Sequence, residues 1–168
     1  MAPFFIIGGT MDSKSKALLI KLPSGKEAFQ RGAIVFTNGG GISDFIIRAA
    51  QGFRGYTHCG IALGDGKMVA AWGAAGCVVL QDDLQQMTTE ARYPDTTEQE
   101  ITRALASLGK PYDFLGLFGL LGLPVWGKGP PDAYFCSSLI ADILYIGTNS
   151  VRPARKTLPN DLWMCLNK

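Results

Sequence analysis

The sequence is poor in charge, in histidine and in the motifs that bind phosphates. Charged residues make up 18% of the 168 residues, the net charge is +2, and the chain holds a single histidine, His58. The densest basic group, at 152–156, has the composition of a solvated loop, so no nucleic-acid partner is expected. No Lys-Ser/Thr pair follows the glycines at 39–41, which excludes a phosphate-binding loop there.

Long apolar runs and export signals are also lacking. No stretch of 18 apolar residues occurs, so no transmembrane segment is predicted. The short apolar run near the start has no basic region before it, which predicts no classical signal peptide. We expect a chain that is cytoplasmic as synthesised, and export by a route that needs no N-terminal signal stays open. The four cysteines show no CxxC spacing, and a domain of this size needs no disulfides, so reduced thiols are expected.

The residues that are present predict one α+β domain over 1–168, with an N-terminal extension of short strands over 1–30. Apolar residues make up 47% of the chain, enough for a sizeable core. Asp65-Gly66 lies between two apolar runs, which predicts a hairpin and an antiparallel sheet. Strands are predicted at 3–7, 17–22, 33–37, 58–63, 67–72 and 76–80.

Helices are predicted mainly in the second half of the chain. Thr97 and Glu100 have the spacing of a capping box, and the helix that they begin ends at Gly109. A second helix is predicted at 134–147. A third helix is predicted nearer the start of the chain, with Ser43 or Asp44 as its N-cap. Two further segments are expected not to be helical. The segment at 25–32 is expected to be a polar turn, and the tail at 157–166 an extended piece.

A metal site at His58 and Cys59 is disfavoured by strand geometry. Adjacent strand residues point to opposite faces of a sheet, so the two side chains cannot easily hold one ion. Zinc would need further ligands from distant elements. We therefore expect no metal and no cofactor.

Cys136 is the best candidate for a reactive thiol. It stands in the first turn of a predicted helix, where unpaired N–H groups and the helix dipole favour the thiolate and can hold an oxyanion. The only histidine, His58, opens a predicted core strand and is the available general base. The other cysteines fall within apolar patterns that predict buried strand residues: Cys59, Cys77 and Cys165.

Several pieces of the sequence, taken in order, resemble a known family. They are similar to the circularly permuted NlpC/P60 cysteine hydrolases of the papain-like group, in which the histidine strand precedes the cysteine helix. The resemblance covers about 31–162. Its pieces are Tyr56-Thr57-His58-Cys59-Gly60-Ile61-Ala62-Leu63-Gly64-Asp65-Gly66, Gly109-Lys110-Pro111-Tyr112-Asp113-Phe114, Tyr134-Phe135-Cys136-Ser137-Ser138-Leu139-Ile140 and Thr157-Leu158-Pro159-Asn160-Asp161-Leu162.

The resemblance implies a papain-like fold, an antiparallel sheet packed on helices, and an activity. Cys136 would be the nucleophile and His58 the base, cleaving an amide bond in a peptide, plausibly of the bacterial cell wall (peptidoglycan). The relatives of the permuted group include lecithin:retinol-acyltransferase-like proteins. The alternative to a peptide hydrolase is therefore a lipid acyl hydrolase or acyltransferase that uses the same two residues. A catalytically inactive binding module is a third. Whether a partner protein inhibits the activity stays open.

The sequence departs from the family pattern where the histidine should be oriented. The family places a polar residue on the strand after the histidine strand, and this chain has Ala70 and Ala71. A backbone carbonyl or Asp44 is expected to orient the ring instead, and Ser137 is the other candidate orienting or oxyanion residue. The second departure is Ser138, where Glu is common.

The apolar segment 115–126 bears on the substrate. Packing against the second helix is one interpretation. The other is an exposed rim that accepts an acyl chain or lies on a membrane surface. We assign the substrate rim to the following residues: Tyr56, Trp72, Leu117, Phe118 and Trp126.

Overall fold

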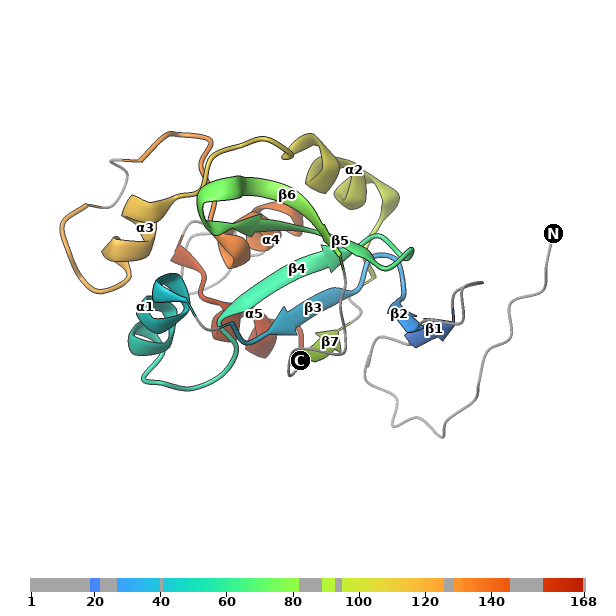
Figure 1. The fold of residues 1–168 in the computed structure, drawn as a ribbon, viewed down its shortest axis with the longest axis horizontal. Helices are drawn as coiled ribbons and strands as arrows, with labels where there is room; N and C mark the ends of the chain where they lie inside the picture. The colour runs from blue at the N-terminus through green and yellow to red at the C-terminus, as the bar shows by residue number, and fades with distance from the viewer. Residues whose placement is uncertain are drawn as a thin grey trace.

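A computed structural model describes residues 19–21, 27–39, 41–81, 89–92, 95–125, 129–145 and 156–167. The architecture is α+β, with most strands before most helices (Figure 1). The strands are β1 (Leu19–Lys21), β2 (Glu27–Phe29), β3 (Ile34–Thr37), β4 (His58–Ala62), β5 (Lys67–Trp72), β6 (Gly76–Gln81) and β7 (Thr89–Arg92). The helices are α1 (Ile42–Ala50), α2 (Glu98–Ala106), α3 (Phe114–Gly119), α4 (Cys136–Ile143) and α5 (Pro159–Cys165), with a 3-10 turn at Gly73–Ala75.

The main sheet is five-stranded and antiparallel, in the order β6-β5-β4-β3-β7. The β4–β5 hairpin forms as predicted: Leu63 N–H donates to the Lys67 carbonyl over 2.8 Å. Gly64 and Gly66 adopt positive φ angles of +86° and +78° in this turn, a region that glycine enters at little cost. The predicted antiparallel meander is confirmed.

Strand alternation divides the core between the two faces of the sheet. On one face Phe36, Cys59 and Ile61 join a cluster with α4, which packs on β4 and β5. On the other face Val35, Ala62 and neighbouring residues form a smaller cluster. This placement sets the first turn of α4 against the start of β4, where Cys136 Sγ lies 3.8 Å from the Thr57 carbonyl oxygen.

The predicted helix starts are partly confirmed. Thr97 caps α2: its hydroxyl accepts from Glu100 N–H, and the Glu100 carboxylate accepts from Thr97 N–H. Cys136 is the first residue of α4, as expected. The N-cap of α1 is Gly41, not Ser43 or Asp44, because the Asp44 carboxylate reaches back from the third helical position and accepts from Gly41 N–H over 3.0 Å.

Two predictions of secondary structure are wrong. The tail forms α5 rather than an extended piece, since Pro159 suits the first turn and the Asp161 carboxylate accepts from Leu158 N–H. The expected polar turn at 25–32 contains β2, which pairs with β1. The predicted strand at 3–7 lies outside the described residues. None of the described helices has the length and apolar character needed to cross a bilayer.

Candidate active site

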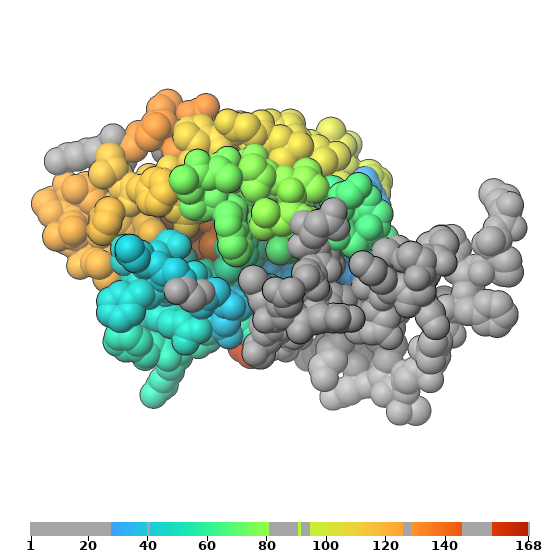
Figure 2. All heavy atoms as spheres, in the orientation of Figure 1, coloured from blue at the N-terminus to red at the C-terminus, as the bar shows by residue number. Residues whose placement is uncertain are grey.

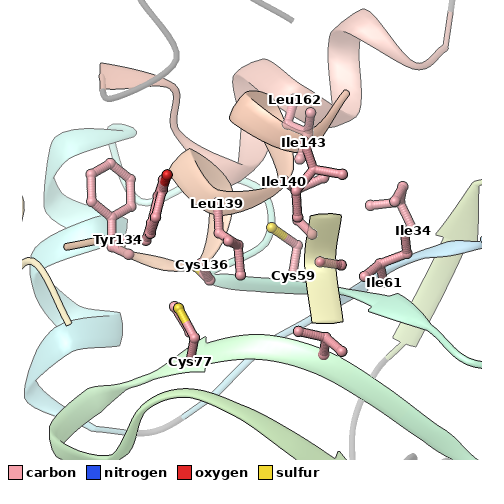
Figure 3. Close-up of a cluster of buried hydrophobic side chains, with 14 of the residues drawn as sticks. Ile34, Cys59, Ile61, Cys77, Tyr134, Cys136, Leu139, Ile140, Ile143 and Leu162 are labelled. Carbon is pink, nitrogen blue, oxygen red and sulfur yellow. The ribbon is translucent and has the colours of Figure 1, made fainter. Parts of the chain in front are cut away.

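Cys136 lies at the buried junction of α4 and β4. Its side chain is fully buried, and its Sγ lies 3.8 Å from the Thr57 carbonyl oxygen, one residue before β4. Figure 3 shows it in one cluster with Cys59 of β4 and with Leu139 and Ile140 of its own helix. The thiol therefore faces the strand that begins with His58.

The surroundings of Cys136 favour the thiolate. A hydrogen bond from Cys59 lowers the pKa of the Cys136 thiol, burial opposes this, and the charge and a side-chain hydrogen bond of His58 lower the pKa further, to well below the ordinary range of a thiol. The N-terminus of α4 acts in the same direction. Burial and the contact with Cys136 raise the pKa of Cys59. Cys59 is thus a buried strand residue, as expected, but it also contacts Cys136, which strand alternation did not predict.

His58 is buried on the sheet beside a tryptophan. The β4–β5 register pairs Ile61 with Val69, and continued toward the start of β4 it sets Trp72 across from His58. The two ring centroids lie 4.6 Å apart at 88°, an edge-to-face contact. Ala70 is fully buried. The strand on which the family places a polar partner therefore supplies an aromatic ring instead.

Three buried polar atoms without a hydrogen-bond partner among the described residues belong to residues at the end of β3 and the start of β4. They are His58 Nε2, Thr37 Oγ1 and Asn38 Oδ1. Thr37 is paired directly with His58 in the β3–β4 register, so the side chains lie on one face of the sheet. Buried polar groups in proteins are nearly always paired. The pairing makes Thr37 of β3 a candidate for orienting the imidazole.

Tyr112 is a site residue that pattern reasoning did not single out. It is buried in the cluster that contains Cys136. Burial raises the pKa of its hydroxyl well above the ordinary range, and negative charge on Cys136 and Asp44 raises it further. Tyr112 therefore stays neutral and keeps its O–H donor near the thiol. The only signal for it was its place in the resemblance piece 109–114.

The two proposed orienting or oxyanion residues are engaged elsewhere. The Asp44 carboxylate caps α1 through Gly41 N–H. The buried Ser137 hydroxyl donates to the Thr157 carbonyl oxygen over 2.7 Å and so ties α4 to the segment before α5. Among the described residues, neither side chain forms a hydrogen bond with His58.

The predicted rim residues have different surroundings. Trp72 is 38% exposed and contacts His58. Tyr56 is partly buried, 5.6 Å from Phe36 between ring centroids. Leu117 is a core residue and lines no rim, whereas Phe118 is 40% exposed. Trp126 lies outside the described residues.

The other two cysteines lie apart from the thiol–imidazole pair. Burial raises the pKa of Cys77 to about 11 although Lys110 lowers it. Cys165 ends the helix α5 and is partly exposed, so its predicted strand position is wrong. Among the residues that the structure describes, no three His, Cys, Asp or Glu side chains gather to hold a metal ion.

The arrangement has the parts that acyl transfer needs: a thiol at a helix start, an imidazole beside it, and a neutral phenol nearby. No protein-family model matches the chain, and neither does any curated protein.

Proposed function

We propose that this protein is a cysteine hydrolase that acts through a covalent thioester on Cys136, in a permuted papain-like NlpC/P60 domain. The observation that carries the proposal is that His58 and Cys136, which are far apart in the chain, lie close together in the fold. His58 begins β4 and Cys136 begins α4. The antiparallel sheet with α4 packed on β4 and β5 is in keeping with that fold.

The reaction follows from the positions of three groups. The Cys136 thiolate attacks a substrate carbonyl, and backbone N–H groups at the start of α4 and the Tyr112 hydroxyl donate to the oxyanion. His58 gives its proton to the leaving amine as the tetrahedral intermediate collapses to a thioester. A water molecule then attacks the thioester, His58 takes its proton, and the acid leaves with the thiolate restored.

We propose that His58 is oriented from β3 rather than β5. The unpaired Thr37 Oγ1 faces the same side of the sheet as His58, and Asn38 Oδ1 follows it in the chain. Either oxygen accepts from Nε2–H through one buried water, which leaves Nδ1 for the thiol. This arrangement replaces the partner that Ala70 cannot supply.

The preferred substrate class is an amide bond in a peptide, including cell-wall peptides, as the resemblance implies. A lipid acyl bond is the second candidate, and a specific observation favours it. Phe114 and Leu115 of α3 are exposed apolar residues, and the Phe114 ring centroid lies 4.8 Å from that of Tyr112. An acyl chain would find an apolar surface next to the site.

The test offers both substrate classes to the protein in parallel. Cell-wall muropeptides are assayed for released amine, and phospholipid vesicles for released fatty acid, with Cys136→Ala and His58→Ala as controls. Each variant is expected to lose turnover and the covalent acyl-enzyme seen by mass spectrometry. Turnover that survives either substitution would refute the pair, and tight binding without turnover would identify an inactive binding module.

A further inference from the structure

Two contacting helices, and the turns that follow them, carry exposed apolar side chains that the proposed chemistry does not use. We call these residues the α1–α3 surface: Ile42, Phe45, Phe53, Phe118, Leu121 and Leu123. Ile42 is 81% exposed, Phe45 62% and Phe53 65%. Helices α1 and α3 contact each other, and Figure 2 shows α1 (cyan) directly beside α3 and the residues after it (gold to orange). Monomeric proteins rarely expose large apolar residues in such a group without a use for them.

Phe53 is held on this surface at an energetic cost. Its φ is +60°, a left-handed conformation in which a bulky residue is an outlier and glycine or asparagine is favoured. The turn is fixed by Gln51, whose side-chain amide donates to the Arg54 and Tyr56 carbonyl oxygens. The Phe53 ring lies 6.0 Å from that of Phe45, edge to face. Strained residues that persist are concentrated at functional places.

The segments 41–56 and 113–125 carry two arginines and two carboxylates, and both carboxylates are bound to backbone N–H groups. The two carboxylates in the segments 41–56 and 113–125 both accept from N–H groups at helix starts: Asp44 from Gly41 and Asp113 from Gly116, over 3.0 and 2.7 Å. Helix N-termini offset such negative charge. Arg48 lies in α1, three residues after Phe45, and the exposed Arg54 follows Phe53.

We propose that the α1–α3 surface docks this protein on a bilayer that contains anionic lipid. Phenylalanine and leucine side chains beside arginines suit the boundary of headgroups and acyl chains, where rings enter the apolar layer and guanidinium groups meet lipid phosphates. A protein partner would be expected to meet more hydrogen-bonding side chains in the surface, but 113–125 carries one charged residue, the capping Asp113.

Docking here would bring lipid to the site. Phe114 contacts Tyr112, and Leu117 of α3 joins the core cluster of Cys136. This consequence, unlike the docking itself, rests on the proposed function. If that function holds, the acyl groups of the bilayer are the nearest substrates. Binding itself needs neither Cys136 nor His58, so Cys136→Ala is expected to dock as well as the wild type, and the two proposals can fail separately.

The test is flotation of the full chain with vesicles of phosphatidylcholine and phosphatidylglycerol at 3:1, and with pure phosphatidylcholine. The wild type is expected to float with the anionic vesicles and to be released by raised salt. Phe53→Gly removes the ring and the strain together, so it is expected to fold at least as well and to bind about fivefold more weakly. Arg54→Gln is expected to weaken binding to the anionic vesicles alone by about fivefold.

The chain offers a matched control. Tyr145 is also a 63% exposed aromatic residue at positive φ, +51°, but it lies after α4 against Arg103. Tyr145→Gly makes the same backbone change away from the α1–α3 surface and is expected to leave vesicle binding unchanged. The proposal is overturned if the wild type does not float, if both glycine variants bind equally, or if light scattering shows a dimer that Phe53→Gly dissociates.

Discussion

At the scale of single residues, the protonation state of Cys136 is the property most open to measurement. Because Cys59, the positive charge of His58 and the helix start lower the pKa of the Cys136 thiol, its alkylation by iodoacetamide should follow a pH profile with a midpoint below the ordinary value of about 8.5. His58→Asn removes the positive charge, so the midpoint should rise. Rates are measured peptide by peptide by mass spectrometry.

Cys77 is the internal control for this profile. Burial raises the pKa of its thiol to about 11, so its alkylation should still be rising when that of Cys136 is constant. A common midpoint for both cysteines, or a midpoint of Cys136 that His58→Asn leaves in place, would contradict an activated thiol.

The orientation of His58 from β3 gives a second prediction. Thr37→Val keeps the shape of the side chain and removes Oγ1, the polar atom paired across from His58. We expect kcat to fall by about tenfold or more and the pH profile of Cys136 alkylation to shift upward, because the ring tautomer is no longer fixed. Thr37→Ser keeps the hydroxyl and should restore both. If Thr37→Val changes stability but neither kcat nor the profile, Thr37 only packs.

What the sequence predicts at this scale is which residues are candidates for the reacting pair, not what surrounds them. His58 and Cys136 stand out as a single histidine at a strand start and a thiol at a helix start. Thr37 and Cys59 could not be selected, because their approach depends on the β3–β4 register and on how α4 lies over β4. Neither the register nor this packing can be predicted from the spacing of residues along the chain.

At the scale of elements, the capping box of α2 gives a matched pair of substitutions. Thr97→Ala removes the side-chain acceptor of Glu100 N–H and is expected to lower the free energy of unfolding by about 1 kcal/mol. Thr102 lies within the same helix, and its hydroxyl donates only to the Glu98 carbonyl. Thr102→Ala should be neutral or slightly stabilising, since alanine has the higher helix propensity. Urea denaturation measures both, and equal losses would contradict the cap.

The elements that pattern reasoning identified have strong local signals, and the missed ones do not. The strands β3 to β6 are apolar runs, and the β4–β5 turn carries Asp65-Gly66. β7 is the short polar sequence TEAR, and only its pairing with β3 makes it a strand. α5 differs, because Pro159 and Asp161 were visible as a helix start.

At the scale of the whole molecule, the proposed nucleophile has no exposed surface in the native state. Cys136 is 0% exposed and His58 6%, so a substrate can reach them only when part of the structure opens. A small opening exposes Cys136 alone, whereas global unfolding exposes every buried cysteine equally. Relative labelling rates separate these cases, since Cys59 and Cys77 are as deeply buried.

Trp72 is the side chain whose movement would open the site at least cost. It is 38% exposed, lies at the end of β5 and packs edge-on against His58. Trp72→Ala should therefore speed the labelling of Cys136 at least tenfold with a weak dependence on urea, while the labelling of Cys77 follows only the change in global stability. Trp72→Phe keeps a ring against His58 and should stay near the wild-type rate. If Trp72→Ala speeds Cys77 and Cys136 by the same factor, Cys136 is reached only by global unfolding, and a substrate would need another route to it.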